Sequence, residues 1–264
     1  MESVKTKMKI TVNCLVKNEE KFVWFAINSV LDWVDEILVW DTGSTDKTLE
    51  ILQEINDPKL KVVKMGAQTD SGITLLRQQM LERSNCDWLM ILDGDEIWSQ
   101  QALREAKGQM SKDYSILVNP VKMLIGDIYH YQEEEAGRYA IRGRVGHYNI
   151  RFVKRNIPGL HFSEDYGSEG FRDVDNQRIQ DSDAKIFFMK NPYLHASHLR
   201  RSSQDSKKYK FELGRPFSKD YYFPEVLFRP RPADVTCPWS KRSRSYFVKG
   251  LLVTPLKMIR RRLL

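Results

Sequence analysis

The stretch that decides the fold is Trp88-Leu89-Met90-Ile91-Leu92-Asp93-Gly94-Asp95-Glu96. Asp87 to Leu92 is strongly apolar and predicts a strand, which runs straight into an acidic turn. Two carboxylates one residue apart at a strand end favour a hard divalent cation with oxygen ligands, Mg²⁺ or Mn²⁺. Because Asp-x-Asp alone is a common pattern, an ordinary acidic turn is the alternative. The apolar strand before it favours the metal site.

Strand and helix patterns alternate on both sides of this stretch, as far as about residue 120. Further strands are expected over Lys9 to Val16, Glu36 to Trp40, Leu60 to Lys64 and Ser115 to Asn119. Helices are expected after the caps Asn18 and Ser99, and over Thr45 to Ile55 and Ser71 to Arg83. Repeated strand–helix–strand units predict an α/β fold, with a mostly parallel sheet and helices on both faces.

Three of the expected strands are followed by, or end in, a polar side chain: Asn18, Asp41 and Asp93. In sheets of this kind, ligands bind at the carboxyl ends of the strands. We therefore expect these three side chains to share one rim of the sheet and to form a binding site there.

The periodicity weakens beyond Asn119. Strands are expected over Asn149 to Lys154 and Ala184 to Met189. A linker wrapped on the body is expected next, because prolines recur at Pro216, Pro224, Pro230, Pro232 and Pro238. Tyr246 to Leu264 predicts a basic amphipathic helix that is interrupted at Pro255, so the chain should carry a basic C-terminal extension.

The charge is unevenly spread along the chain. Residues 199–264 carry 17 Lys and Arg against 5 Asp and Glu, a net charge of +12, so the first 198 residues carry −5 of the overall +7. The acidic part holds the motifs above. The basic part is expected to face an anionic surface, either a membrane or a nucleic acid.

Three widely spaced cysteines, Cys14, Cys86 and Cys237, form neither a metal pattern nor a disulfide framework, which favours a reducing, cytoplasmic compartment. Met1 to Lys9 carries charges and has no apolar core, so it is not expected to be a secretory signal. No stretch approaches the roughly 20 apolar residues that span a bilayer.

Three motifs resemble a known family. Val12-Asn13-Cys14-Leu15-Val16-Lys17-Asn18-Glu19-Glu20, Val39-Trp40-Asp41-Thr42-Gly43-Ser44-Thr45-Asp46-Lys47-Thr48 and Ile91-Leu92-Asp93-Gly94-Asp95-Glu96 resemble, in order and spacing, family 2 glycosyltransferases of the GT-A fold. The resemblance covers residues 8–120 well and residues 140–200 loosely. It implies a GT-A-like fold with a nucleotide-sugar-binding half over residues 1–120, an acceptor-binding half over 121–215, and the linker and tail over 216–264.

The resemblance also implies roles at matching positions. Val16, Asn18 and Glu19 match the segment that flanks the nucleotide base, and Asp41 matches the aspartate that accepts a hydrogen bond from the base. Arg77 matches a basic residue near base or phosphate, Asp93 the aspartate near ribose and metal, and Asp95 the direct metal ligand. Asp41 as a turn residue and Arg77 as a solvated helix arginine are the alternatives.

Two further roles are less clearly marked. The catalytic base is expected in the pair Glu164-Asp165, with Asp165 favoured. Some family members place His-Glu directly after a Gly-hydrophobic pair. This chain differs from them, because its sequence there is Gly159-Leu160-His161-Phe162-Ser163-Glu164. A late histidine often reaches the metal or the diphosphate in GT-A enzymes, and a neutral imidazole suits a divalent metal. His195 is favoured over His198 because it comes first after the strand.

The resemblance thus implies an inverting glycosyltransferase that uses Mn²⁺ or Mg²⁺. It would move a sugar from a nucleotide donor, with UDP favoured, to a hydroxyl of a glycan such as a cell-envelope polysaccharide, or of a lipid-linked acceptor. The tail would hold it peripherally on the cytoplasmic face of an anionic membrane. No nucleic-acid partner is expected, because no RNA or DNA motif accompanies the charge. The alternative is a non-catalytic sugar- or nucleotide-binding protein that retains the fold.

Other phosphate enzymes fit the sequence less well. Phosphatases of the dehalogenase type place Asp-x-Asp after the first strand, whereas here it follows roughly the fourth. Sugar nucleotidyltransferases carry a Gly-rich loop after strand one, and Lys17-Asn18-Glu19-Glu20 lacks those glycines.

Overall fold

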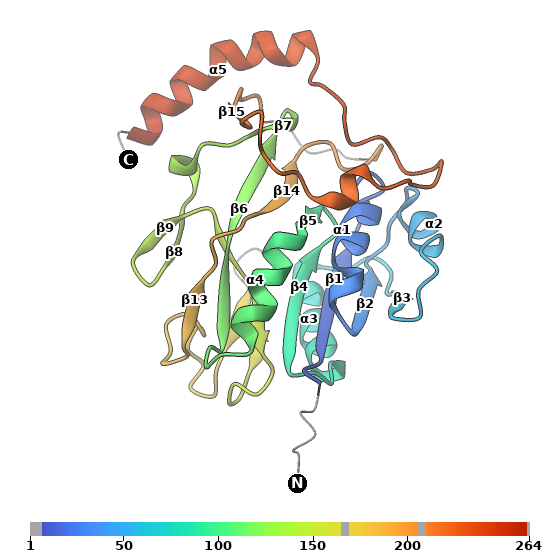
Figure 1. Cartoon of the computed structure of the whole chain (residues 1–264), viewed down its shortest axis with the longest axis vertical. Helices are drawn as coiled ribbons and strands as arrows, with labels where there is room; N and C mark the ends of the chain where they lie inside the picture. The colour runs from blue at the N-terminus through green and yellow to red at the C-terminus, as the bar shows by residue number, and fades with distance from the viewer. Residues whose placement is uncertain (1–6, 165–168, 205–209, 263–264) are drawn as a thin grey trace.

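One large mixed sheet runs through the molecule (Figure 1). The structure is a computed structural model and describes residues 7–164, 169–204 and 210–262. Within these residues the sheet has eleven strands, eight of them in the order β15-β7-β6-β10-β4-β1-β2-β3, with β5, β13 and β14 paired beside this path.

The strands of this sheet are β1 (Ile10–Val16), β2 (Glu36–Asp41), β3 (Leu60–Lys64), β4 (Trp88–Asp93), β5 (Glu96–Ile97), β6 (Ile116–Ile125), β7 (Asp127–Tyr131), β10 (Tyr148–Lys154), β13 (Ile186–Phe188), β14 (Tyr193–His198) and β15 (Arg215–Pro216). Two small hairpins are formed by β8 (Tyr139–Ile141) with β9 (Arg144–Gly146), and by β11 (His161–Ser163) with β12 (Gly170–Arg172). The helices are α1 (Val23–Val30), α2 (Thr48–Gln53), α3 (Asp70–Arg83), α4 (Gln100–Met110) and α5 (Arg244–Arg262), with short 3-10 turns at Leu31–Trp33, Glu134–Ala136 and Glu225–Phe228.

The first half of the sheet is parallel, as predicted. Strand β1 pairs with β2 on one side and with β4 on the other, and β2 pairs with β3, all in parallel. Strand β10 then joins β4 to β6 in an antiparallel arrangement. Strands β1, β2 and β4 are buried on both faces, which is why β1 and β4 are apolar along most of their length, whereas β3 at the edge is largely exposed.

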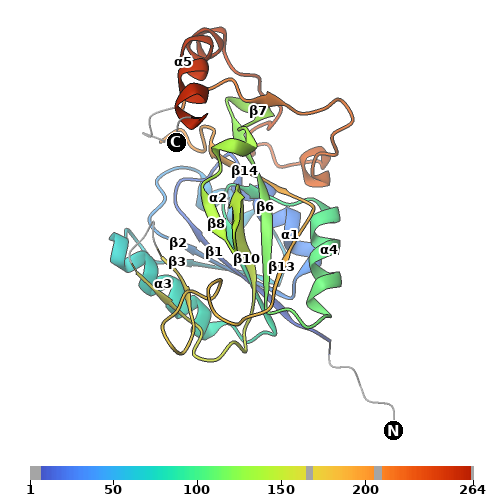
Figure 2. The same ribbon diagram turned by 90° about the vertical axis from the view of Figure 1, so that its left-hand side faces the viewer.

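Helices cover both faces of the parallel part (Figure 2). Ile37 and Val39 of β2 point into a core shared with α1, whereas Leu38 and Trp40 point to the opposite side and pack with Leu76 of α3. Alternate side chains of one strand therefore meet different helices. This arrangement confirms the predicted α/β layering.

Two predicted helix starts differ in the structure. Asn18 is not the N-cap of α1, which begins at Val23; its side chain instead accepts a hydrogen bond from the backbone of Thr45 at 2.8 Å. Helix α2 begins at Thr48 because Asp46 holds the preceding turn, accepting from the Thr48 amide at 2.9 Å. The cap at Ser99 is confirmed, since its hydroxyl accepts from the Ala102 amide at 3.1 Å.

The tail forms one continuous helix, so the predicted interruption at Pro255 is wrong. Proline removes one backbone hydrogen bond, to the carbonyl four residues earlier. Pro255 is exposed, so water can satisfy that carbonyl. No helix in the described part of the chain is long and apolar enough to cross a membrane.

The expected boundary at residue 120 falls inside β6, and strands from both sides of it belong to one sheet. The two proposed halves therefore share a single layer of strands. Their functional division stays a proposal.

Candidate functional site

The Asp-Gly-Asp turn lies where β4 ends, packed tightly against the loop after β1. A Cβ atom on Gly94 would lie 2.8 Å from Cγ of Glu19 and 3.1 Å from Cγ1 of Val16. Such contacts are too close for any other residue without movement. Glycine between the two aspartates is thus required for the turn and this loop to meet.

Strand register sets the spacing of the rim. Leu15 of β1 pairs with Asp93, and Val16 pairs with Asp41 on the other side of β1. Asp41 and Asp93 are therefore two strands apart, about 10 Å at the usual strand spacing. The structure places both aspartates at the carboxyl ends of parallel strands, as predicted.

Asp41 uses only one of its two carboxylate oxygens within the protein. Its Oδ1 accepts hydrogen bonds from the amides of Gly43 and Ser44, both at 3.0 Å, as in an Asx turn. Its Oδ2 is buried and has no hydrogen-bond partner among the described residues. A buried acceptor without a donor is costly, so this oxygen is suited to a ligand. Asp41 is thus a turn residue with one oxygen to spare.

The loop after β1 is tied to the loop after β2. The Asn18 amide donates to Ser44 Oγ at 2.9 Å, and the Glu19 amide donates to Thr48 Oγ1 at 2.8 Å. Asn18 adopts a left-handed backbone conformation with φ of +56°, which asparagine tolerates better than most residues. These bonds fix the wall of the rim that contains Val16, Asn18 and Glu19.

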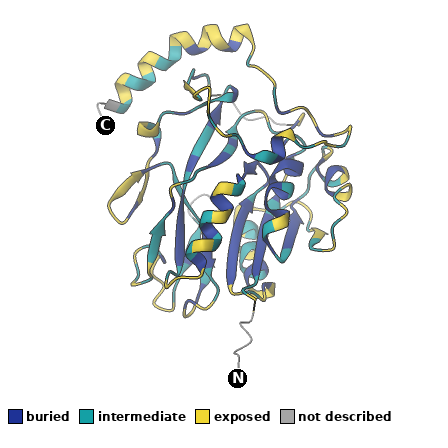
Figure 3. Ribbon diagram, in the orientation of Figure 1, coloured by how far each residue is buried: buried dark blue, intermediate teal, exposed yellow. Residues whose placement is uncertain are grey.

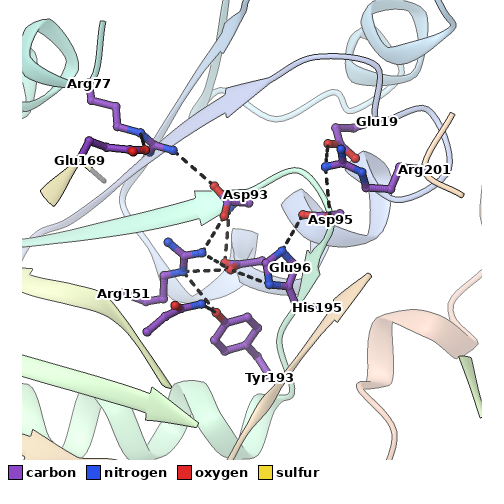
Figure 4. A network of polar contacts seen from close by, with 11 residues as sticks. Glu19, Arg77, Asp93, Asp95, Glu96, Arg151, Glu169, Tyr193, His195 and Arg201 are labelled. Carbon is purple, nitrogen blue, oxygen red and sulfur yellow. Dashed lines mark hydrogen bonds and ion pairs between the residues drawn. The ribbon is translucent and has the colours of Figure 1, made fainter. Parts of the chain in front are cut away.

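Carboxylates and one imidazole gather at the end of β4 (Figure 4). One ligand atom from each of Asp93, Glu96 and His195 lies within 4.8 Å of the others. His195 Nε2 also lies 3.2 Å from Asp95 Oδ1. Of the two late histidines, His195 of β14 is therefore the one in the cluster. His198 lies 3.3 Å from Lys210 Nζ instead.

Arginines from three segments surround the carboxylates. Arg151 of β10 binds Asp93 Oδ2 through Nη2 at 2.6 Å and Glu96 Oε1 through Nε at 2.9 Å. Arg77 of α3 lies 3.7 Å from Asp93 Oδ1, so it is not a solvated helix arginine. Arg201 lies 2.5 Å from Glu19 Oε1 and 3.4 Å from Asp95 Oδ2. Figure 4 shows these three groups facing the same acidic turn.

An aromatic stack holds one end of this network. Tyr193 stacks on Trp98 with ring centroids 4.5 Å apart. Its hydroxyl accepts hydrogen bonds from Asn149 Nδ2 at 2.6 Å and from Arg151 Nε at 3.3 Å. Arg151 is therefore fixed from behind as it reaches Asp93.

The charges of the cluster follow from these contacts. Burial opposes ionisation of Asp93, but the guanidinium groups of Arg151 and Arg77 outweigh it and hold the pKa of Asp93 far below its usual range. Likewise, burial opposes the charge on His195, yet the neighbouring Asp95 raises the pKa of His195 to about 8. Burial also opposes ionisation of Asp95, but His195 and Arg201 outweigh it and lower the pKa of Asp95. Burial raises the pKa of Glu96. Both aspartates of the motif are thus carboxylates at neutral pH.

This donor set fits a divalent cation. Carboxylate oxygens and a neutral imidazole nitrogen are ligands that Mn²⁺ accepts readily, and Mg²⁺ takes the oxygens. Because the pKa of His195 is raised to about 8, its ring would release a proton on binding the cation at neutral pH. The buried Nδ1 of His195 has no hydrogen-bond partner among the described residues, whereas Nε2 lies 3.2 Å from Asp95 Oδ1, so the ring is held at the acidic turn with one nitrogen unpartnered by a hydrogen bond. Glu96 is added to the candidate ligands, although Arg151 already occupies its Oε1.

The proposed base falls at the edge of the described chain. Asp165 lies outside the described residues. Glu164 is described, and its two carboxylate oxygens face Arg172 and Arg178, the latter at 3.3 Å. Its backbone carbonyl accepts from Thr74 Oγ1 at 2.7 Å. Glu164 thus sits in a small ion-pair cluster of its own.

Three site residues were not found from the sequence: Arg151, Tyr193 and Glu169. Glu169 Oε1 lies 3.5 Å from Nε of Arg77, which brings a third downstream carboxylate beside the cluster. No motif marks them. Only Arg151 could have been found from the sequence. It lies between Ile150 and Phe152 in an expected strand, and a charged residue in that position needs a buried partner of opposite charge.

The comparison with known proteins agrees with this geometry. The model of the family described as glycosyl transferase family 2 matches residues 13–165, which is more than half of the chain. The chain therefore belongs to glycosyl transferase family 2.

Curated relatives and solved structures extend this result. The chain is 30% identical over 109 residues to the SPbeta prophage-derived glycosyltransferase SunS of Bacillus subtilis, and 25% identical over 160 residues to a TPR repeat-containing protein of Synechococcus elongatus. These matches cover 41% and 60% of this chain but only 24% and 34% of the two relatives, so the chain matches about a quarter and about a third of their respective lengths.

Crystal structures of S. aureus TarS share the fold. TarS 1-349 superposes with a TM-score of 0.50 and 19% identity, covering 72% of this chain and 61% of TarS 1-349. The same protein in complex with UDP-GlcNAc gives a TM-score of 0.50 at 18% identity, over 75% of this chain and 61% of that one. The fold is GT-A.

Proposed function

We propose that this chain is an inverting, divalent-metal-dependent glycosyltransferase that uses a UDP-linked sugar. The observation that carries the proposal is a pair of complementary features on either side of β1. On one side, the buried Oδ2 of Asp41 has no hydrogen-bond partner within the part of the chain that the structure describes, and on the other Asp93, Asp95 and His195 converge. A nucleotide lying across the end of β1 would place its base at Asp41 and its diphosphate at the acidic turn.

Asp95, His195 and Asp93 would hold Mn²⁺ or Mg²⁺. When bound, the cation would neutralise charge on the diphosphate as it departs. The chain's own cations would add to this, because Arg77 and Arg201 face the same turn. Asp41 would accept the base N–H, and Val16, Asn18 and Glu19 would form the wall beside it.

The sugar would be transferred by one direct displacement. A carboxylate would take the proton of the acceptor hydroxyl while that oxygen attacks the anomeric carbon and the bond to the diphosphate breaks. Asp165 is the proposed base. Glu164 is the second choice, because its oxygens already face two arginines.

The donor and acceptor are proposed at the level of class. TarS 1-349 has been crystallised with UDP and with UDP-GlcNAc, and the shared fold makes UDP-GlcNAc the first donor to test. The proposed acceptor is a hydroxyl of a glycan or lipid-linked glycan at the cytoplasmic face of a membrane.

Two measurements test this function. Titration calorimetry should show UDP binding that strengthens with Mn²⁺, and donor hydrolysis without acceptor should yield UDP from at least one of several UDP-sugars. UDP binding without any turnover would favour a non-catalytic nucleotide-binding protein. Failure to bind UDP under either condition would contradict the proposal.

A further inference from the structure

Helix α5 docks on the body through a polar stripe. Tyr246 Oη donates to the Lys210 carbonyl at 2.6 Å, and Thr254 Oγ1 accepts from the Leu213 amide at 2.9 Å. Arg261 makes a two-pronged ion pair with the buried carboxylate of Glu212, at 2.6 and 2.9 Å. The helix is therefore held by hydrogen bonds and charge at several points along its length.

The opposite side of α5 is apolar and exposed. Val248, Leu251, Leu252, Leu256 and Ile259 are between 49% and 71% exposed, and we call them the outer stripe. At about 100° per residue these positions lie roughly opposite Tyr246, Thr254 and Arg261 on the helix. Figure 3 shows exposed residues along the side of α5 that faces away from the body.

This is the reverse of an ordinary surface helix, which buries its apolar side and leaves its polar side in water. Contiguous exposed apolar surface of this kind marks an interaction site. The neighbouring charges indicate what covers it. Lys249, Arg244 and Arg260 are exposed on the same helix, and Arg244–Arg262 contains no acidic residue.

We infer that α5 is a membrane-docking surface that lies flat on an anionic bilayer, with the outer stripe in the acyl boundary and the flanking cations at the headgroups. A second copy of the chain fits less well, because it would bring two cationic helices together. The inner polar contacts would keep α5 attached to the body while its outer side enters the lipid.

The docking surface also sets the orientation of the enzyme. In Figure 1, strands β1 and β4 run from the end of the molecule where the described chain begins towards the end where α5 lies. The acidic turn after β4 is at the carboxyl end of that strand. Docking through α5 would thus bring the site-bearing end of the sheet to the membrane. This inference does not depend on the proposed chemistry.

Vesicle co-sedimentation of the full chain tests it. The protein should pellet with vesicles that contain phosphatidylglycerol and remain largely in solution with phosphatidylcholine alone. Replacing two residues of the outer stripe, Leu252→Glu and Leu256→Glu together, should lower the partition coefficient by about tenfold or more. The matched control is Leu75→Glu on α3, which is 57% exposed and lies away from α5; it should bind like the unaltered chain.

Charge variants and the oligomeric state separate the remaining explanations. Lys249→Gln and Arg260→Gln should each weaken binding by about fivefold, and added salt should reduce binding of the unaltered chain. Near-identical melting temperatures would show that the variants fold. Equal binding to neutral and anionic vesicles would overturn the inference. So would a dimer in analytical ultracentrifugation that the outer-stripe variant abolishes, together with no vesicle binding.

Discussion

Arg151 Nη2 lies 2.6 Å from Asp93 Oδ2, which joins β10 to the acidic turn after β4 through an ion pair at the edge of the core. The same guanidinium group also holds Glu96, a residue with no exposed surface. The contact links the second half of the chain to the Asp-Gly-Asp motif of the first half. It also balances part of the negative charge that three carboxylates would otherwise concentrate there.

Replacing Arg151 with Met should lower the free energy of unfolding by about 3 kcal/mol, because two largely buried carboxylates would lose their counter-charge. Urea denaturation measures this. Arg229→Met is the control: its pair with Asp32 at 3.1 Å is largely exposed, so the loss should stay under about 1 kcal/mol. Equal losses in the two variants would show that Arg151 adds no more than a surface pair.

Asp95→Asn should reduce metal-dependent turnover on the order of 10²-fold, because it removes a charged ligand and keeps the shape. Mn²⁺ titration monitored by calorimetry should weaken in parallel, and excess chelator should reproduce the loss in the unaltered enzyme. Asp113→Asn is the matched control, since that carboxylate pairs with Lys185 on the surface. Full activity of Asp95→Asn, or of the unaltered enzyme in chelator, would exclude the metal site.

Asp41→Asn separates the two roles of this residue. Asparagine can keep the acceptor for the amides of Gly43 and Ser44, but it replaces the second carboxylate oxygen, Oδ2, with an NH₂ group. UDP affinity should fall by about 1.5–3 kcal/mol, the range for hydrogen bonds to charged groups, while melting temperature stays nearly constant. Unchanged UDP affinity in calorimetry would leave Asp41 as a turn residue alone.

The catalytic base can be identified by comparing three variants, each of which replaces one candidate carboxylate with the corresponding amide. Asp165→Asn should lower kcat on the order of 10²-fold with little change in UDP affinity, as expected for a lost general base. Glu164→Gln and Glu169→Gln should change kcat much less. Should either of these two show the large loss with intact UDP binding, the base would be that residue and Asp165 would be discounted.

The attachment of α5 should depend on pH through Glu212. Burial would raise the pKa of Glu212, but Arg261 and Lys257 outweigh it and the pKa is lowered. A lowered folded-state pKa means that the ion pair stabilises above the unfolded value of about 4.5 and that this stabilisation is lost as pH falls through the folded-state pKa. Hydrogen-exchange protection factors of α5, corrected for intrinsic rates, should drop in acid.

Arg261→Met provides the comparison. At neutral pH it should reduce α5 protection on the order of tenfold, because Glu212 loses its main partner. The difference from the unaltered chain should shrink in acid, where Glu212 is neutral in both. A constant difference at all pH values would show that Arg261 acts by packing alone.

Local patterns predicted the parallel half of the fold well. Buried strands are specified locally by the apolar run Trp88–Leu92 and by the alternating segments around it. Burying apolar side chains is favourable in any fold, so these segments form buried strands whatever their neighbours in the sheet. Strand order then brings Asp41 and Asp93 to one rim, so this part of the candidate site followed from sequence. Asn18 as a helix cap failed because a contact with Thr45, distant in sequence, took its side chain.

What only the tertiary structure decided is pairing between distant segments. Arg151, Tyr193 and Glu169 come from strands and loops whose position around Asp93 depends on how β10, β14 and β12 fold back onto the first half. The sequence of the tail likewise determines an amphipathic basic helix but not which side docks. The docking side is determined by the carboxylate of Glu212 and the backbone amide of Leu213. These groups bind one side of α5 and leave its apolar side facing outward. Periodicity is a local property, whereas the partner of a charged or polar side chain is fixed only when the whole chain is assembled.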